Sequence, residues 1–335
     1  MQTRLKLLLL VPVALVALVI YLDWTGDRRS GPLLSDLRTL PIESLGVASG
    51  RGNLIGIETR LQPADYQSRE RLKLKFATYL AQARDAGLLT DKTIVVLPEH
   101  VGTGLFALGE KPEVQQARTL RDAMQWMALS NPWQYLRALS GGNPRDDRRT
   151  EAVLLLKAER MAADYQAIFG ELAREFGVTL VAGSIVLPEP RLEAGRLRLD
   201  DGPLRQVSLT FDPQGRPLAP LQYKQHLGRY ERRYSVAPQN YRPTLLPTPA
   251  GALAVLLGCD AYRQPVPPGA DMLAVPGAPD ELAAGCPDGV RPALPHVAVR
   301  TLGMPWNLLG SPRRPASTTH SEPVRITNHW LPERP

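Results

Sequence analysis

Short apolar runs alternate along this chain with longer stretches in which apolar residues recur at helical spacing. In the stretch 66–86, Leu72, Phe76, Leu80 and Ala83 fall on one face of a helix. The same reading predicts helices at 66–86 and 151–176, and strands at 53–58, 93–97, 178–187, 205–211, 252–257 and 272–275. Because strands and helices alternate, we expect an α/β domain built from layers of helices and sheets.

Two regions depart from this alternation. Residues 111–149 carry Trp126, Trp133 and Tyr135 and have a helical pattern. They are either a surface insertion that packs its own apolar face or a lid over a functional site. Residues 280–335 are rich in Pro, Gly and Arg and show weak periodicity, so we expect an irregular, Pro-rich tail.

The N-terminal segment has the pattern of a signal anchor. Arg4 and Lys6 precede an almost unbroken apolar run from residue 7 to residue 22, and no small-x-small cleavage pattern follows closely. We therefore expect residues 1–24 to form an uncleaved transmembrane helix with its positive end in the cytoplasm. A polar linker at 25–44 would then lead to a folded domain at 45–335. This organisation predicts a single-pass protein of a bacterial inner membrane with its domain in the periplasm.

Composition narrows the classes of function. Among 335 residues, 44% are hydrophobic and 22% are charged, as in ordinary folded proteins, and the formal charge is +7. The arginines are spread along the chain without an aromatic-interleaved stripe, so nucleic acid is not an expected partner. Neither GxxxxGK[ST] nor GxGxxG after a strand is present, which leaves a nucleotide-binding fold unsupported. A homodimer is compatible with the sequence, which does not determine the oligomeric state.

The chain has only two cysteines, Cys259 and Cys286. Two thiols form at most one bridge, so a scaffold built on disulfides is excluded. Two interpretations of Cys259 stay open. It is either a reactive thiol or one half of a disulfide with Cys286, and the second would leave no thiol for catalysis.

Three separated segments each place one reactive side chain at or just beyond an apolar run. Glu99 follows Val95-Val96-Leu97-Pro98, Lys224 follows Tyr223, and Cys259 follows Leu256-Leu257-Gly258. Apolar runs of this length predict buried strands, and the ends of strands are where α/β proteins collect catalytic groups. A thiolate nucleophile, a carboxylate base and a fixed ammonium are the three groups that attack on an amide carbonyl requires.

In this order the segments resemble the Glu-Lys-Cys triad of the nitrilase, or carbon–nitrogen hydrolase, superfamily. Further matches are Phe211-Asp212-Pro213-Gln214-Gly215 before the lysine and Gly269-Ala270-Asp271 after the cysteine. The resemblance implies a nitrilase-like α-β-β-α sandwich that needs neither a metal nor an organic cofactor. It also implies a small-molecule amide or acyl substrate.

Residue by residue, the resemblance implies Glu99 as general base and acid, Lys224 as the cation that stabilises the oxyanion, and Cys259 as nucleophile. Glu231 would orient Lys224 or the substrate amine, and Asp260 would offer its backbone N–H to the oxyanion. His100 and His226 lie beside these positions without metal-ligand spacing, so we interpret them as supporting or structural residues.

Three functions follow as expectations. The first is an amidase-type carbon–nitrogen hydrolase that works through a cysteine thioester. The second is an N-acyltransferase of the lipoprotein acyltransferase type, which the N-terminal anchor and the basic surface favour. The third is a catalytically silent, membrane-tethered binding protein on the same fold. The third is motivated by two departures of this chain from the family pattern. The acidic Asp260 follows Cys259 directly, and three prolines stand at 265, 267 and 268.

Overall fold

The computed structural model describes residues 2–28, 36–141, 146–277, 286, 294–302, 305–306 and 323–333. The helices are α1 (Gln2–Gly26), α2 (Arg69–Asp85), α3 (Pro112–Gln116), α4 (Leu120–Ser130), α5 (Pro132–Gly141), α6 (Arg148–Phe176) and α7 (Asp260–Arg263), with 3-10 turns η1 (Pro63–Tyr66), η2 (Thr103–Ala107) and η3 (Glu231–Arg233). The strands are β1 (Glu43–Leu45), β2 (Asn53–Glu58), β3 (Thr93–Val96), β4 (Thr179–Val181), β5 (Ile185–Glu193), β6 (Arg196–Phe211), β7 (Pro217–Tyr223), β8 (Leu246–Thr248), β9 (Gly251–Val255), β10 (Met272–Pro276), β11 (His296–Val299) and β12 (Arg325–Trp330).

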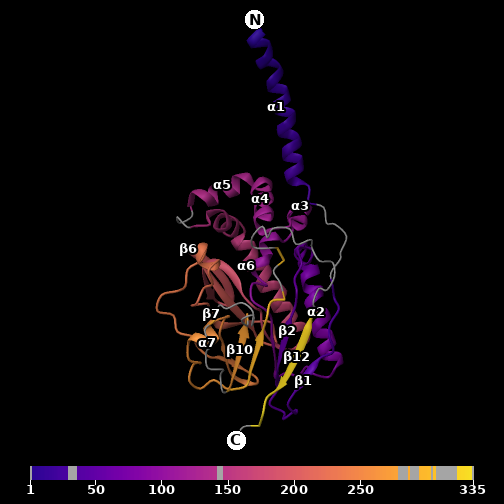
Figure 1. The fold of residues 1–335 in the computed structure, drawn as a ribbon, viewed down its shortest axis with the longest axis vertical. Helices are drawn as coiled ribbons and strands as arrows, with labels where there is room; N and C mark the ends of the chain where they lie inside the picture. Colours follow the sequence, from indigo (N-terminus) through magenta and orange to yellow (C-terminus); the bar gives the residue numbers. More distant parts are fainter. Residues whose placement is uncertain are drawn as a thin grey trace.

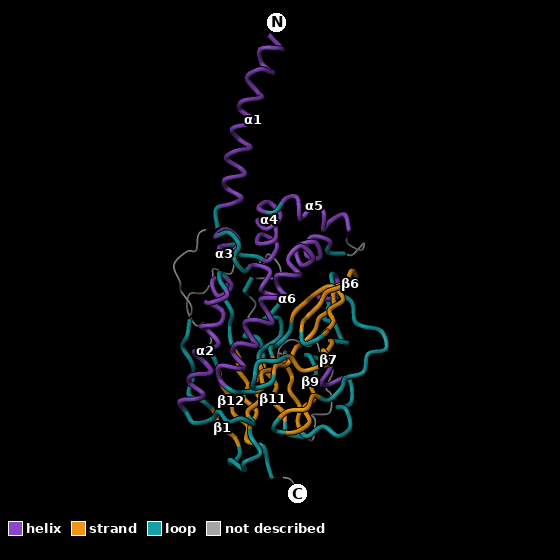
Figure 2. The backbone as a smooth tube through the Cα atoms, turned by 180° about the vertical axis from the view of Figure 1, so that it is seen from behind, coloured by secondary structure: helices purple, strands orange, loops and turns teal. Residues whose placement is uncertain are grey.

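Two sheets form the body of the molecule. The larger has the order β1-β12-β2-β3-β4-β6-β5, with β7 paired to β6, and the smaller has the order β11-β10-β9-β8. Helices α2 and α6 lie against the larger sheet, and α3, α4 and α5 gather at the end from which α1 projects (Figure 1). Seen from behind, α1 again extends away from the body, and the C-terminus lies at the opposite end (Figure 2).

Alternation along the central strands explains the layers. On β3, Val95 packs into the core beneath the helices, whereas Ile94 and Val96 pack into the core between the sheets. Successive side chains of a strand point to opposite faces, so a continuous apolar run is buried on both sides. The predicted α/β class is confirmed. On the outer face of the smaller sheet, the described residues contribute only the short α7 in place of a second full helical layer.

Most of the predicted elements are present, and three predictions were wrong. The predicted strand 178–187 is two strands, β4 and β5, separated by Gly183, which has φ +67° and lies so close to Pro98 O that a Cβ would collide with it. In the tail predicted to be irregular, the described residues include β11 and β12, and β12 lies inside the larger sheet between β1 and β2. Most of the rest of the predicted tail lies outside the described residues. The predicted linker includes most of β1 and the bridge between Thr39 and Val324.

Helix α1 is held to the body at its C-terminal end. Tyr21 donates to Leu129 O at 2.7 Å, and the ammonium of Lys111 lies 4.3 Å from the centre of the Trp24 ring. Arg28 forms an ion pair with Glu110 at 2.5 Å. Within the described segments, no helix combines the length and the apolar character needed to cross a membrane. The predicted transmembrane assignment of residues 1–24 is therefore not supported.

Glu110 is a buried charge that joins three parts of the chain. Its carboxylate is fully buried, pairs with Arg28 and Lys157, and accepts from Asn131. Burial lowers the pKa of Lys157, so this ammonium depends on the nearby carboxylate to stay charged.

Replacing Glu110 with Gln is expected to lower the free energy of unfolding by about 3–5 kcal/mol, because it leaves the Lys157 ammonium buried without a counter-charge. Urea unfolding at pH 7 measures the change. Glu175→Gln, at an exposed pair with Lys73, is the matched control and should change stability by less than about 1 kcal/mol. An equally small change for Glu110→Gln would contradict the prediction.

Candidate active site

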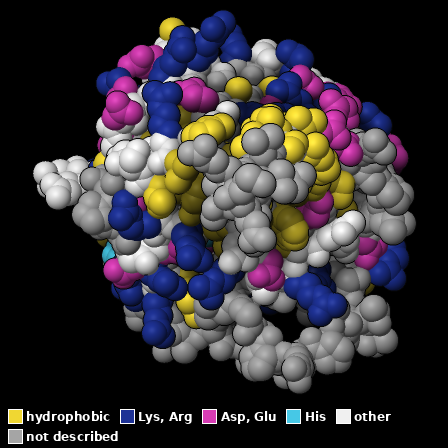
Figure 3. Space-filling model, turned by 90° about the horizontal axis from the view of Figure 1, so that it is seen from above, with side chains coloured by type: hydrophobic (Ala, Val, Ile, Leu, Met, Phe, Trp, Pro, Cys, Tyr) yellow, Lys and Arg dark blue, Asp and Glu magenta, His cyan; other side chains and the backbone are white. Residues whose placement is uncertain are grey.

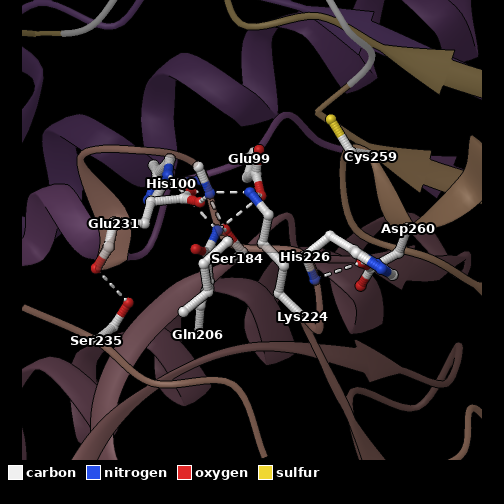
Figure 4. Close-up of polar contacts among 12 residues, drawn as sticks. Glu99, His100, Ser184, Gln206, Lys224, His226, Glu231, Ser235, Cys259 and Asp260 are labelled. Atoms are coloured by element: carbon white, nitrogen blue, oxygen red, sulfur yellow. Dashed lines mark hydrogen bonds and ion pairs between the residues drawn. The ribbon is translucent and has the colours of Figure 1, made fainter. Parts of the chain in front are cut away.

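Three acidic and basic side chains predicted from separate segments meet at one point. Glu99 follows β3, Lys224 follows β7, and Glu231 begins η3. The ammonium of Lys224 lies 2.6 Å from Glu99 Oε1 and 2.8 Å from Glu231 Oε1, so one cation bridges both carboxylates (Figure 4). All three side chains are almost completely shielded from solvent. Low exposure strengthens their mutual attraction, because little water screens it.

The sheet geometry explains why these residues meet. The backbone N–H of Leu97 donates to Val181 O, which carries the chain from β3 along β4 to Glu99. The hairpin of β6 and β7 returns to the same end, where Lys224 N donates to Gln206 O at 3.0 Å. Thus the strand pairing places the Glu99 carboxylate and the Lys224 ammonium at the same end of the larger sheet's strands.

A second set of polar side chains orients the first. His100 Nε2 lies 2.9 Å from Glu231 Oε1, and its backbone N–H donates to Ser184 Oγ at 2.8 Å. Gln206 Nε2 donates to Glu99 Oε1 at 2.7 Å and to Ser184 Oγ at 3.0 Å. His100 has φ +62°, a backbone conformation that residues other than glycine seldom adopt. Strained backbone of this kind is common at functional sites, where the surrounding contacts hold it in place.

The network separates the proton affinities of the two carboxyl groups. Burial raises the pKa of Glu99, and the charge of Glu231 adds to the increase, against the opposing charge of Lys224. Burial acts on Glu231 in the same direction, but the hydrogen bond from His100 and the charge of Lys224 outweigh it and hold its pKa well below the usual range. For Lys224, burial opposes the charged form, but the two carboxylates prevail and raise its pKa. Of the two carboxyl groups, Glu99 is therefore the one with the higher proton affinity and the better suited to accept and return a proton.

Two glycines that follow strands of the smaller sheet bring their backbone close to this network. A Cβ on Gly258 would lie 3.4 Å from both Glu99 Oε2 and Lys224 Nζ, and a Cβ on Gly277 would collide with the Glu99 carboxylate. Both glycines have positive φ values, +53° and +83°. The chain just before Cys259 thus passes close to the Glu99–Lys224 pair. At position 277 only glycine leaves room for the Glu99 carboxylate, and at position 258 the positive φ favours glycine.

Cys259 is not a free thiol in this structure. It forms a disulfide with Cys286, at a Cα–Cα distance of 5.3 Å. Figure 4 draws no hydrogen bond or ion pair between Cys259 and Glu99 or Lys224. The prediction of Cys259 as nucleophile therefore does not describe the disulfide form, because a sulfur already bonded to sulfur offers no thiolate for attack on a carbonyl.

Asp260 has a different position from the predicted one. Its backbone N–H donates to Leu257 O at 3.1 Å, so this amide is already occupied and does not face an oxyanion. Its buried carboxylate accepts from the N–H groups of Gln225 and His226, at 2.8 and 2.7 Å, and lies 2.7 Å from His226 Nδ1. Asp260 thus fastens the turn that follows Lys224 to the residue after Cys259, and His226 has a structural role.

A cation site is one further interpretation of the network. Glu99, His100 and Glu231 offer ligand atoms within 4.8 Å of one another. However, the ammonium of Lys224 already lies between the two carboxylates and supplies the compensating positive charge. A metal ion would have to displace Lys224, so we assign this position to the lysine.

Gln206 and Ser184 were not predicted as site residues. Gln206 lies within β6 and Ser184 between β4 and β5, in polar-apolar patterns that indicate only strands. The buried Gln206 Oε1 has no hydrogen-bond partner among the described residues. The signal that could have identified Gln206 is a polar side chain at a buried position of a strand. The sequence alone does not show that this position is buried.

The depressed pKa of Glu231 makes stability depend on pH in a defined direction. Its charge stabilises the folded protein fully above about pH 4.5, the ordinary pKa, and this contribution is lost as the pH falls toward the lower folded value. Glu231→Gln should therefore cost about 3 kcal/mol at pH 7. Between pH 7 and pH 3 the difference from wild type should narrow by about 2 kcal/mol, since each pH unit below the unfolded pKa removes about 1.4 kcal/mol.

Urea unfolding at several pH values measures this difference for Glu231→Gln. Glu175→Gln is again the control and should differ from wild type by a small amount that does not change with pH. A difference for Glu231→Gln that stays constant from pH 7 to pH 3 would show that the ion pair makes no net contribution.

Comparisons with known proteins give the following picture. No protein-family model matches the chain, and no curated protein matches its sequence. It is similar to the structure of a carbon–nitrogen hydrolase from Helicobacter pylori G27, with 17% identity and a TM-score of 0.41, over 69% of this chain and 61% of that one. It is also similar to a mutant of an amidase of the nitrilase superfamily from Nesterenkonia AN1, with 15% identity and a TM-score of 0.38, over 70% of each chain. The chain thus spans less than two thirds of the Helicobacter pylori enzyme.

Proposed function

We propose that this protein is an amidase-type carbon–nitrogen hydrolase in which Cys259, when reduced, is the nucleophile. The observation that carries the proposal is the position of Gly258, the residue before Cys259, where an added Cβ would lie 3.4 Å from both Glu99 Oε2 and Lys224 Nζ. A base and a fixed cation with little access to water therefore lie close to the segment that leads from β9 to Cys259. Glu231 and His100 set the protonation states of that pair.

The chemistry would proceed in two steps. Glu99 takes the proton of the Cys259 thiol, the sulfur bonds to the amide carbon, and Lys224 stabilises the oxyanion that forms. The C–N bond breaks as Glu99 returns the proton to the leaving amine, which leaves a thioester. Water then gives a proton to Glu99 and attacks the thioester carbon, and the proton returns to sulfur as the carboxylic acid leaves. Raising the pKa of Glu99 and keeping Lys224 charged both serve this cycle.

The disulfide favours a second candidate function, a catalytically silent binding protein. If Cys259–Cys286 persists under all conditions, the network of Glu99, Lys224 and Glu231 would hold a ligand without reacting with it. Buried charged networks also occur as structural features, so perturbed proton affinities do not by themselves establish catalysis.

Intact-mass analysis separates the two candidates. The protein is reduced with dithiothreitol and exposed to a panel of small amides and acyl esters, alongside Cys259→Ala and Cys286→Ala. Hydrolase chemistry predicts an acyl adduct on wild type and Cys286→Ala but not on Cys259→Ala. Discharge by water or by an added amine then distinguishes hydrolysis from acyl transfer. If the reduced protein forms no adduct with any donor and Cys259 alkylates no faster than a model thiol, the silent candidate is correct.

A further inference from the structure

We propose that a cavity at the α4–α5 end of the molecule binds an anionic amphiphile, meaning an alkyl chain that carries a carboxylate or a phosphate group. The cavity has a volume of about 960 Å³ and lies among α4, α5, the N-terminal end of α6 and η3. This volume is within the usual range for small-molecule sites. We call it the α4–α5 cavity. It is separate from the network around Lys224, so the proposal does not depend on the chemistry of Cys259.

One wall of the α4–α5 cavity is apolar. Leu120, Met124 and Ala128 lie four residues apart on α4, so they line a single face of that helix, and Tyr135 of α5 joins them. The buried Met124 accepts a hydrogen bond at sulfur from Thr150. A wall of methionine and aliphatic side chains adapts to a flexible alkyl chain more readily than to a rigid polar ligand.

The other side of the α4–α5 cavity is basic. Four arginines and two aspartates line it, a net charge of +2. Arg121, Arg149 and Arg233 come from α4, α6 and η3, are exposed, and make no side-chain hydrogen bond or ion pair with any residue that the structure describes. Guanidinium groups bind carboxylate and phosphate oxygens in a forked geometry. Three of them, without acidic partners in the described residues, select an anionic group.

The other charged residues that line the α4–α5 cavity do not neutralise the three arginines. Asp147 caps α6 by accepting from the backbone N–H and the hydroxyl of Thr150, and Arg148 donates to Leu139 O. Asp146 is the one other acidic residue of the lining. An anion entering the cavity therefore meets an excess of positive charge.

The surroundings of the α4–α5 cavity are apolar as well. Trp133 is 79% exposed, Leu136 55% and Leu129 51%, and all three belong to α4 or α5. Figure 3 shows the end of the molecule from which α1 projects, where both hydrophobic side chains and many Lys and Arg side chains are exposed. Exposed apolar side chains on the two helices that line the cavity, together with three arginines that have no acidic partner in the described residues, suit a ligand with an apolar chain and an anionic group, whether it arrives as a monomer or from a lipid surface.

Calorimetric titration of the full-length protein tests the proposal. The probes are dodecanoate and dodecyl phosphate, each below its critical micelle concentration. Dodecyltrimethylammonium, which has the same chain and a positive charge, is the control for charge, and inorganic phosphate, which has no chain, is the control for the alkyl chain. Dodecanoate and dodecyl phosphate should bind, and both controls should bind at least about tenfold more weakly. The combined Arg121→Gln, Arg149→Gln and Arg233→Gln variant should lose at least about tenfold in affinity. Ala128→Trp, which places a bulky ring against the apolar wall of the cavity, should abolish binding.

Arg137→Gln is the matched control, because Arg137 is exposed on α5 but does not line the α4–α5 cavity. It should leave dodecyl phosphate affinity unchanged. Flotation with vesicles of equal parts phosphatidylcholine and phosphatidylglycerol distinguishes the source of the ligand. Binding of monomers that Ala128→Trp removes supports the proposal. Absence of monomer binding, equal binding of the cationic probe, or equal loss in Arg137→Gln overturns it, and vesicle binding alone would indicate surface attraction instead.

Discussion

Cys286→Ala should hydrolyse amides without added reductant, whereas wild type should do so only after treatment with dithiothreitol. In the oxidised wild type, the sulfur of Cys259 is bonded to that of Cys286 and cannot attack a carbon. Dithiothreitol supplies two electrons and two protons, which give two thiols, and is itself oxidised to its cyclic disulfide. Oxidised wild type should be at least about 10³-fold less active than Cys286→Ala, since losing the nucleophile of a comparable catalytic unit costs up to about 10⁶-fold.

The measurement is the initial rate of amide hydrolysis for wild type and the two cysteine variants, each with and without dithiothreitol. Cys259→Ala should be inactive under both conditions, and Cys286→Ala should be equally active under both. Equal rates for oxidised and reduced wild type would exclude Cys259 as the nucleophile. Urea unfolding of Cys286→Ala at the assay temperature shows whether the variant is folded, so that a low rate caused by unfolding can be recognised.

Glu99→Gln should lower kcat/KM for amides by about 10²–10⁴-fold, the usual contribution of a general acid–base group. Gln is nearly isosteric and leaves Lys224 paired with Glu231, so the cation should remain in place. The variant therefore removes proton transfer and leaves most of the site intact. Steady-state kinetics of the reduced protein give the change, and Glu175→Gln, at an exposed surface pair, should retain wild-type activity.

The pH profile gives a second readout for Glu99. Burial raises the pKa of Glu99 above its ordinary value of 4.5, and only the ionised form accepts the thiol proton. In wild type, kcat/KM should fall as the pH drops through this raised value. The residual activity of Glu99→Gln should lack that acidic limb. A full-activity Glu99→Gln, or an unchanged acidic limb in the variant, would exclude Glu99 as the base.

Local patterns were enough to predict the central strands, and a family resemblance added three of the charged site residues. The apolar runs that became β2, β3, β9 and β10 are buried on both faces, so their composition alone distinguishes them from solvent-exposed segments. Glu99 and Lys224 were predicted from their positions after apolar runs and from the family resemblance, Glu231 was predicted from the resemblance alone, and the structure brings all three together. Strand ends converge because parallel pairing aligns them.

The strands of the C-terminal tail and the break between β4 and β5 could not be predicted, because both depend on contacts between residues that are far apart in the sequence. β12 is stabilised by pairing with β1 and β2, hundreds of residues earlier, so a short polar strand such as Arg325–Trp330 has no strong local signal. Gly183 interrupts the strand predicted at 178–187 because Pro98 O lies against it. Steric exclusion of this kind exists only once both segments are folded.

The sequence by itself determined which residues carry the charges and the thiols, which runs are apolar enough to be buried, and that Cys259 has one available partner. Only the tertiary structure decided how these groups are used. It brought Cys286 within disulfide distance of Cys259, engaged the Asp260 carboxylate with the N–H groups of Gln225 and His226, and set His100 and Gln206 against the carboxylates of the site. The physical reason is that hydrogen bonds, ion pairs and disulfides act over a few ångströms, and segments far apart in the chain reach that range only through the packing of the two sheets.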